Sequence, residues 1–356
     1  MVDRSGEPQV RTAARLSDVA AAAGVSLSTA SKVLNGRGRA SEETRRRVLA
    51  TAARLDFQPN ALAKSFALGR SYTIGILANN APETFTMPVL IGANAELSRY
   101  DMASLLYNAD RDPELRAEHV RRLRARQVDG LLVIGIGADD RLPSVSGFPA
   151  PVVYVNGVSD SPRDASFPPE NRKAGRMAAE HLIGLGRTRI AHITGDEMAP
   201  AVIDRGAGFR EALREAGLTM AFGQPLFGNY YREWGFRAAR RLLDADCPVD
   251  GLFAGNDEIG LGAFAAFREA GLRVPEDIAI VGYDNFSRIT NLQKRVLTTV
   301  DPNLETVGSA AVRHLLRAIG GDAEPGVHSV DCTLVEGYST VGGTPPGAPV
   351  EVVFSL

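Results

Sequence analysis

The sequence predicts an α/β protein with a three-helix, helix-turn-helix head followed by a larger, doubly wound α/β body. Residues 16–57 contain three short helical patterns, and beyond residue 70 apolar strand-like runs alternate with amphipathic helical stretches. Lys and Arg outnumber Asp and Glu 12 to 6 in residues 1–70, but are outnumbered 28 to 36 in the remainder. A basic head on an acidic body is the charge pattern expected if only the head contacts phosphate.

The first two helical patterns are joined by Gly24, which permits a sharp turn. We expect Ser17 to cap the first helix, whose apolar positions 16, 19, 20 and 23 share one face. Ser26 is expected to cap the second helix, with positions 30, 33 and 34 facing inward. Its outward side chains near the helix start are Leu27, Ser28, Ser31 and Lys32. This is the layout of a recognition helix.

A third helix is expected to begin after Ser41, with acidic residues at 42 and 43 favouring its amino end. Positions 48, 52 and 55 follow at helical spacing, and Phe57 can close the small core. Three arginines at 45–47 either contact phosphate or form a solvated face. The head therefore has the elements and the charge of a DNA-binding domain.

Beyond residue 70, the chain alternates between two patterns. Strand-like runs occupy 72–78, 130–137, 151–156, 189–195, 251–256 and 277–283, and helical stretches occupy 89–100, 114–127, 171–186, 208–217 and 235–245. Continuous apolar strands between amphipathic helices predict parallel sheets that are covered on both faces. Such sheets bind ligands at the carboxyl ends of their strands.

Several protein classes are disfavoured by the sequence. It has no apolar run of about 18 residues and no apolar signal core, so we expect a cytoplasmic protein without a membrane segment. Cys247 and Cys332 show neither metal-ligand spacing nor a disulfide framework. The five histidines lack metal-ligand spacing, and no nucleophile elbow or phosphate loop is present. We expect no enzymatic activity, no metal and no cofactor.

Six motifs in a fixed order give the chain a family resemblance. They are LSDVAAAAGVSLSTASKVLNG, PNALAKSF, DRGAGF, FAGNDEIGLGA, DIAIVGYDN and LTTVDPN. With them the chain resembles the LacI/GalR (lactose-repressor) family of transcriptional regulators across roughly residues 16–340. The resemblance implies a homodimer on a near-palindromic double-stranded DNA operator. It also implies a two-lobed, periplasmic-binding-protein-like body, with chain crossings near 168–171, 299–303 and 330.

The resemblance also assigns DNA-contacting residues in the head and linker. Lys32 would donate to a guanine edge, Leu27 would contact a thymine methyl, and Ser28 would contact a base or phosphate. Ser26, Thr29 and Ser31 would position the helix on phosphates. Asn60 can cap a short hinge helix that carries Lys64, a phosphate contact. Phe66 occupies the position of the family's minor-groove wedge, or else packs as a linker residue.

The effector site implied by the resemblance combines polar and aromatic side chains. Arg205 and Asp284 match the family's cleft arginine and aspartate, and Asn256 and Asn156 also follow strand-like runs. Tyr230 and Phe85 would add aromatic surface, whereas Trp234 is either a ligand contact or a packing residue. Arg205 can only donate hydrogen bonds and an ionised Asp284 can only accept them, and this pair suits a hydroxyl-rich, sugar-like effector.

The expected domains are a flexible arm (1–15), the helix-turn-helix domain (16–58), a hinge helix and linker (59–71), the effector-binding and dimerisation body (72–340) and a tail (341–356). The tail has no leucine heptads, which favours a dimer over a tetramer. The function expected is an effector-controlled repressor. The alternatives are a repressor that needs a nucleoside or purine corepressor, and an architectural DNA-binding protein whose body only dimerises.

Overall fold

The computed structural model describes residues 14–34, 38–57, 69–80, 85–136, 141–245, 248–285 and 296–343. The chain divides into two compact units, residues 1–71 and residues 72–356. No helix among these described residues is long and apolar enough to cross a membrane.

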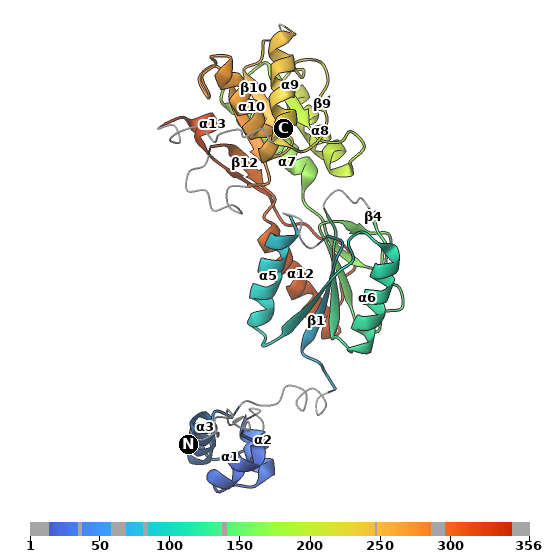
Figure 1. Ribbon diagram of the computed structural model, residues 1–356, viewed down its shortest axis with the longest axis vertical. Helices are drawn as coiled ribbons and strands as arrows, with labels where there is room; N and C mark the ends of the chain where they lie inside the picture. Colours follow the sequence, from blue (N-terminus) through green and yellow to red (C-terminus); the bar gives the residue numbers. More distant parts are fainter. Residues whose placement is uncertain are drawn as a thin grey trace, which may run out of the picture. The chain divides into compact units, whose positions relative to one another are not determined.

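The first unit contains the three predicted helices, α1 (Leu16–Ala22), α2 (Leu27–Leu34) and α3 (Glu42–Arg54) (Figure 1). Ser26 caps α2 by accepting from the backbone amide of Thr29 at 3.1 Å, as predicted. Ser41 caps α3 by accepting from the amide of Thr44 at 3.2 Å, also as predicted. These caps satisfy amides at the helix starts that have no partner within the helix.

The predicted cap of the first helix is wrong. Helix α1 begins at Leu16, so Ser17 lies inside it rather than before it. The residue before the helix is Arg15, whose amide donates to the Asp18 carboxylate at 2.8 Å. An acidic side chain three residues into the helix therefore performs the role expected of the serine.

A small apolar core holds the three helices together, and it contains the positions expected from helical spacing. Its buried members are Val19, Ala20, Ala23, Ala30, Val33, Val48 and Ala52, against which Leu16, Val25, Leu34, Ala40, Leu55 and Phe57 pack.

The second unit contains two six-stranded sheets, each the centre of one lobe. The lobe-1 sheet has the order β13-β7-β5-β3-β1-β2, and all of its neighbouring strands are parallel. Its strands are β1 (Thr73–Ala78), β2 (Ala103–Asn108), β3 (Gly130–Ile134), β5 (Val152–Val155), β7 (Ala165–Phe167) and β13 (Gly326–Val327). Helices α5 (Thr86–Ser98) and α12 (Leu304–Ile319) cover one face, and α6 (Pro113–Ala125) covers the other (Figure 1). A short ladder pairs β4 (Arg141–Leu142) with β6 (Val158–Ser159).

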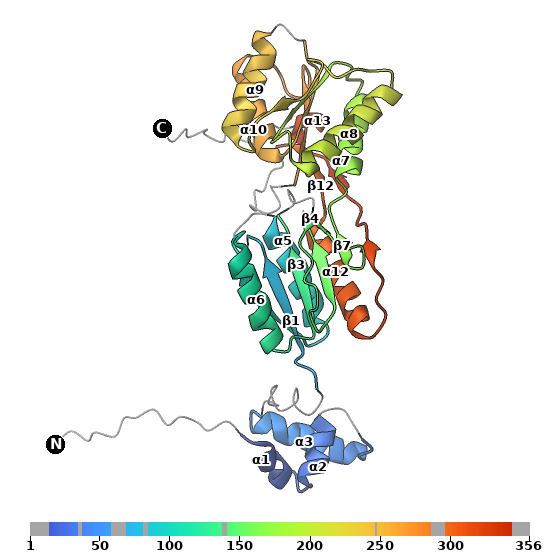
Figure 2. The ribbon, with the colours of Figure 1, turned by 90° about the vertical axis from the view of Figure 1, so that its right-hand side faces the viewer.

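The lobe-2 sheet repeats this order as β14-β12-β11-β10-β8-β9. Its strands are β8 (Ile190–Thr194), β9 (Leu226–Phe227), β10 (Gly251–Ala254), β11 (Ala279–Tyr283), β12 (Thr298–Asp301) and β14 (Thr333–Val335). Only β14 is antiparallel to its neighbour. Helices α7 (Asn171–Gly184) and α8 (Pro200–Glu215) cover one face, and α9 (Arg232–Asp244) and α10 (Asp257–Glu269) cover the other (Figure 2). A last short helix, α13, spans Tyr338–Val341.

The predicted parallel sheets and the three chain crossings are confirmed. The chain passes from β7 in lobe 1 to α7 in lobe 2, returns from β12 to α12, and passes again from β13 to β14. Because the chain returns to lobe 1 after β12, α12 packs on lobe 1 although it follows lobe-2 strands in the sequence. Cys332, next to the last crossing, is a buried free thiol, whereas Cys247 lies outside the described residues.

Candidate functional site

The outward face of α2 is the candidate DNA-reading surface. Leu27 is 54% exposed although it is apolar, and Ser28 and Lys32 are also exposed. Ser31 is partly buried on the same helix. An exposed leucine beside polar groups suits base-edge and methyl contacts in a major groove.

Two of the predicted contact residues already interact with each other. The hydroxyls of Ser26 and Thr29 lie 2.8 Å apart, and Ser26 also caps the helix. Their side chains therefore shape the helix start. The predicted residues Asn60, Lys64 and Phe66 lie outside the described residues.

The arginine cluster of α3 is not uniform. Arg47 Nε donates to the backbone oxygen of Ala23 at 2.9 Å, which ties α3 to the end of α1. This contact gives Arg47 a structural role, while Arg45 and Arg46 have partly buried and exposed side chains respectively.

The candidate effector site begins with Arg205, on α8 at the carboxyl edge of the lobe-2 sheet. Its guanidinium lies 4.2 Å from the centre of the Tyr283 ring and donates to Asn171 Oδ1 at 2.6 Å. The Tyr283 hydroxyl donates to the same oxygen at 3.3 Å. Arg205 is buried, and its Nε has no hydrogen-bond partner among the described residues. A buried donor without an acceptor is costly, so this nitrogen is suited to donate to a ligand oxygen.

Asp284 follows β11 at the same edge and has a left-handed backbone, with φ of 105°. Burial raises the pKa of its carboxyl well above the usual range, and Asp257 and Asp301 raise it further, while Arg205 opposes the shift. Asp301 in turn accepts from the Asn285 side chain at 2.8 Å. The edge thus brings three carboxyl groups near one guanidinium.

Tyr230 lies at the same edge, in the segment before α9. A Cβ built on Gly195 would lie 2.1 Å from the Tyr230 ring, so the ring occupies space that only a glycine leaves open. Burial raises the pKa of the Tyr230 hydroxyl. Trp234 is a packing residue: it packs against the lobe-2 core, and its indole nitrogen donates to the Thr194 backbone oxygen at 2.9 Å.

Asn256 uses most of its side chain within the protein. Its Oδ1 accepts from the Ile259 amide at 2.9 Å and so caps α10, and its Nδ2 donates to the Tyr230 backbone oxygen at 3.1 Å. Asn256 therefore holds Tyr230 and the start of α10 in place.

The two lobe-1 candidates also have internal partners. Asn156 is buried, with φ of 56°, and its Nδ2 donates to the Gly135 backbone oxygen at 3.1 Å. Phe85 lies just before α5 and packs against the lobe-1 core. Most side chains of the candidate site that could contact an effector therefore come from lobe 2.

Sequence reasoning missed Asn171, Tyr283 and Asp301. The last two stand in the motifs VGYDN and VDPN, so position at the end of a strand could have indicated them. Asn171 begins α7 immediately after a chain crossing, and only the fold brings it to Arg205.

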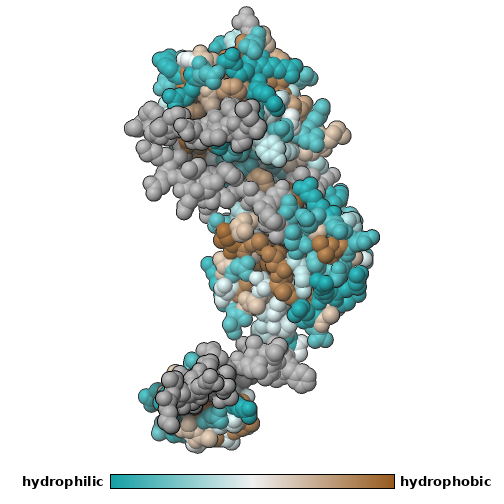
Figure 3. All heavy atoms as spheres, in the orientation of Figure 1, coloured by the Kyte–Doolittle hydropathy of each residue, from teal (hydrophilic) through white to brown (hydrophobic). Residues whose placement is uncertain are grey.

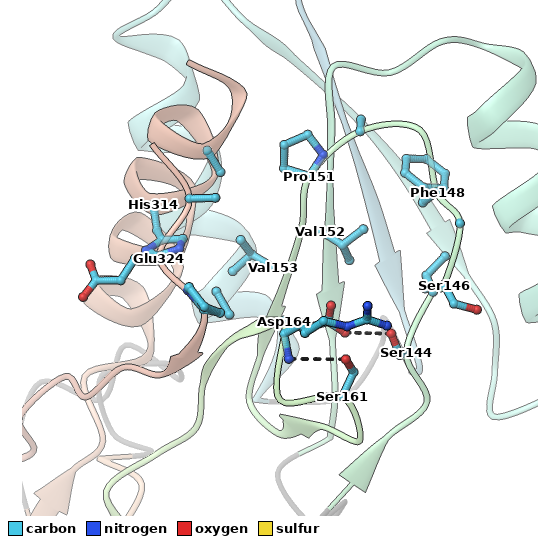
Figure 4. A pocket seen from close by; sticks show the side chains of 18 residues that line it. Ser144, Ser146, Phe148, Pro151, Val152, Val153, Ser161, Asp164, His314 and Glu324 are labelled. Atoms are coloured by element: carbon cyan, nitrogen blue, oxygen red, sulfur yellow. Dashed lines mark hydrogen bonds between the residues drawn. The ribbon is translucent and has the colours of Figure 1, made fainter. Parts of the chain in front are cut away.

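A cavity of about 540 Å³ lies elsewhere, at the amino ends of lobe-1 strands (Figure 4). Its walls are the loop from Ser144 to Pro151, residues 323–325, and the α12 side chains His314 and Ala318. None of the predicted effector residues lines it. Among the described residues, no group of three His, Cys, Asp or Glu side chains could hold a metal ion.

Comparison with known proteins agrees with both parts of this geometry. Residues 15–60 match the model of bacterial regulatory proteins of the lacI family, and residues 179–340 match the periplasmic binding protein-like domain. The ribose operon repressor of Escherichia coli (strain K12) is 32% identical over 314 residues, which is 86% of this chain and 93% of that protein. The chain belongs to the LacI family.

Solved structures of this family show the same architecture. The lac repressor dimer bound to operator and the anti-inducer ONPF matches with a TM-score of 0.73 and 25% identity, covering 92% of this chain and 99% of that one. The complex of transcriptional regulator CelR with cellobiose matches with a TM-score of 0.61 and 30% identity, covering 92% and 99%. This LacI-family protein is a DNA-binding transcriptional regulator with a helix-turn-helix head and a two-lobed α/β body. These relatives are regulators rather than enzymes.

Proposed function

We propose that this LacI-family regulator is a homodimeric repressor whose operator affinity is set by a neutral, hydroxyl-rich molecule, a sugar or a close derivative. The supporting observation is the combination, at one sheet edge, of Arg205, Asp284 and the Tyr230 ring. A guanidinium only donates and an ionised carboxylate only accepts, whereas vicinal hydroxyls do both. An aromatic ring adds an apolar surface for the face of a sugar.

The charge at this edge argues for a neutral effector. Among the described residues there, Arg205 is the cation that interacts with Asp284, and Asp257 and Asp301 are two further carboxyl groups. A phosphate or carboxylate on the effector would add negative charge beside Asp257 and Asp301, which already oppose the ionisation of Asp284. A relative named for a ribose operon and a relative complexed with cellobiose support a sugar as well.

DNA reading is assigned to the exposed face of α2. Lys32 would donate to a guanine edge, Leu27 would contact a thymine methyl, and Ser28 would reach a base or phosphate. Ser26, Thr29 and Ser31 would set the helix on the phosphates. Lys32→Ala should weaken operator binding by about 1–3 kcal/mol and random-DNA binding much less. Equal losses on both duplexes would make Lys32 a phosphate contact.

We assign the interface of the homodimer to the outer surface of α5 and the edge strand β2. Figure 3 shows hydrophobic side chains gathered over α5. Met87 and Ile91 on α5 are 48% and 53% exposed, and Leu106 on β2 is 43% exposed. Apolar side chains gathered at a sheet edge are typical of a protein interface. A second copy of this chain would cover them and pair two heads on one near-palindromic operator.

A thermal-shift screen tests the effector class, since a ligand that binds only the folded state raises its stability by mass action. The panel comprises D-ribose, cellobiose and other neutral sugars, their phosphates, and nucleosides with free purines. We expect a neutral sugar to stabilise the protein and to change its operator affinity. Arg205→Ala should reduce both effects at the same sugar concentration while leaving effector-free operator binding intact.

The other members of the panel decide the alternatives. Stabilisation by a purine that also strengthens operator binding would establish a purine corepressor and overturn the sugar assignment. Operator binding that no panel member changes would favour an architectural protein with a non-sensing body.

We further infer that the protein acts in the cytoplasm, without catalysis, through a reading head (16–58), a hinge and linker (59–71) and a sensing body (72–340).

A further inference from the structure

The same three residues, Val-Asp-Gly, begin the third strand of each lobe, with the glycine as the first strand residue. They are residues 128–130 at the start of β3 and residues 249–251 at the start of β10. In lobe 1, Asp129 Oδ2 accepts from the Tyr72 amide at 3.1 Å. In lobe 2, Asp250 Oδ1 accepts from the Thr188 amide, also at 3.1 Å.

The surrounding backbone shows that Tyr72 and Thr188 are equivalent positions. The Asp129 amide donates to Thr73, the residue after Tyr72, at 2.9 Å. The Asp250 amide donates to the residue after Thr188, which is Arg189, at 3.0 Å. Each aspartate therefore holds the start of the neighbouring strand at both its amide and its carboxylate.

We call each aspartate, Asp129 or Asp250, with its two backbone contacts a clamp. The two clamps hold different segments of the chain. Thr188 belongs to the turn between α7 and β8, inside lobe 2. Tyr72 is the first residue of the second compact unit, so the clamp in lobe 1 acts where the linker meets the body. The lobe-2 clamp holds a turn in the interior of its lobe, whereas the lobe-1 clamp holds the residue at which the second unit begins.

The backbone of Tyr72 indicates that this joint is held against a local preference. Its φ is 52°, in the left-handed region that bulky residues rarely adopt. The Asp129 carboxylate holds its amide, and the Ala103 amide of β2 donates to its carbonyl at 2.9 Å. Such a conformation persists only where its surroundings fix it.

We propose that Asp129 is a positioning residue that couples the effector-binding body to the reading head. By fixing Tyr72, it makes the joint stiff enough for a rearrangement of the lobes to reach the linker. A loose joint would let the linker turn independently of the body, and the two body states would then differ little in operator affinity. This inference rests on the proposed effector-controlled function.

The test compares Asp129→Ala with the matched control Asp250→Ala in the full-length protein. Operator affinity is measured by fluorescence anisotropy on a duplex selected from a random library with the wild-type protein. It is measured without added sugar and with the neutral sugar that stabilises the wild type most in the panel. Thermal unfolding and sugar affinity are measured on the same preparations.

We expect both variants to lose thermal stability, with a sizeable loss in Asp250→Ala because Asp250 also accepts from the Arg189 amide at 2.9 Å. Both should retain wild-type sugar affinity. The sugar-dependent change in operator affinity, about 5- to 150-fold in allosteric proteins generally, should fall towards 1 only in Asp129→Ala. Asp129→Asn keeps an acceptor oxygen for the Tyr72 amide and should retain most of the change.

A wild-type ratio in Asp129→Ala, or an equal loss in Asp250→Ala, would overturn the proposal. Failure of the proposed function is seen separately, as a wild-type protein whose operator affinity no panel member changes. In that case, the sugar-free measurement decides. A stiff joint predicts weaker operator binding by Asp129→Ala than by Asp250→Ala, and equal binding would reject it.

Discussion

Lobe 1 and lobe 2 have the same strand order, strand for strand, but they present different chemistry at equivalent places. The carboxyl edge of lobe 2 combines Arg205, Asp257 and Asp284, whereas the lobe-1 candidates there, Asn156 and Phe85, are uncharged and engaged in internal packing. Lobe 1 instead receives the linker at Tyr72. The two proposals together assign sensing to lobe 2 and transmission to lobe 1.

A second difference concerns the helix that follows the third strand. In lobe 2, β10 leads directly into α10, which packs on α9. In lobe 1, β4 and a loop come after β3 instead. Two arginines of α6 hold this loop. Arg116 donates to the Pro143 backbone oxygen at 2.5 Å, and Arg124 donates to the Gly147 backbone oxygen at 3.0 Å. The loop that takes the place of a helix also lines the lobe-1 cavity.

The feature that the lobes share most closely is a pair of helices in contact through glycines, and breaking it should have the largest effect. A Cβ on Gly308 of α12 would lie 2.2 Å from the Val89 oxygen, and one on Gly208 of α8 would lie 1.9 Å from the Arg172 oxygen. Either alanine substitution forces the helices apart and should lower the free energy of unfolding by more than about 3 kcal/mol. Urea denaturation measures the loss.

The control for this prediction is Gly184→Ala in α7, where a Cβ would meet nothing within 4 Å. It should be neutral, or stabilising by up to about 1 kcal/mol, because alanine favours a helix more than glycine does. If Gly308→Ala were tolerated and Gly208→Ala were not, the helix pairs would be equivalent in position but not in packing.

The next largest effect should be that low pH destabilises lobe 2 more than lobe 1. His192 in β8 stacks on Phe253 at 4.6 Å, while the matching position of β1 holds the buried Ile76. Burial lowers the pKa of His192 from 6.5 to about 4. The unfolded chain therefore binds a proton between these values that the folded protein does not, and stability is lost as the pH falls from 6.5 to 4.

This single histidine should cost about 3 kcal/mol of unfolding free energy across that interval. Hydrogen exchange should show lobe 2 opening before lobe 1 at pH 5, and His192→Phe should reduce the difference. Opening of both lobes together, in wild type and variant alike, would contradict the assignment.

Effector binding should show a smaller asymmetry. Arg205→Ala or Asp284→Ala should weaken sugar binding by about 1–3 kcal/mol, because each leaves a ligand group without its partner. Asn156→Ala in lobe 1 should cost less, since its amide already bonds to Gly135. Calorimetry measures all three, and the reverse ranking would move the main grip to lobe 1.

The pH dependence of this binding has a definite sign. Since burial raises the pKa of Asp284, the ionised acceptor becomes available only as the pH rises through that raised value. Sugar affinity should increase with pH over this range, and Asp284→Asn should make it independent of that titration.

The sequence predicted the head and the parallel sheets because their signals are local. Caps at Ser26 and Ser41 and continuous apolar strands depend on neighbouring residues alone. Edge strand β2 was not among the predicted strands, because its partly exposed residues lack a continuous apolar run or a clean alternation. The prediction for Ser17 failed because the helix begins one residue earlier, at Leu16, and Asp18 accepts from the amide of Arg15, the residue before the helix.

The two charged site residues were predictable because they stand in motifs. Arg205 and Asp284 stand in motifs and could be proposed from the sequence, whereas Asn171 reaches Arg205 through a chain crossing that no local pattern encodes. The internal role of Asn256 was equally hidden, since the same asparagine after a strand can cap a helix or face a ligand.

The smallest expected effect concerns the lobe-1 cavity, which competes with the lobe-2 edge as the place of effector binding. Ala318 lines this cavity from α12 and is partly buried, so Ala318→Phe should fill part of the 540 Å³ space without disturbing the lobe-2 edge. Sugar affinity should stay at the wild-type value, and stability should change by less than about 1.5 kcal/mol, since space is available for the ring. Ala318→Ser, which leaves the cavity open, is the control. Loss of sugar binding in the phenylalanine variant alone, with an unchanged free energy of unfolding, would place the effector in lobe 1 and reverse the division between a sensing and a transmitting lobe.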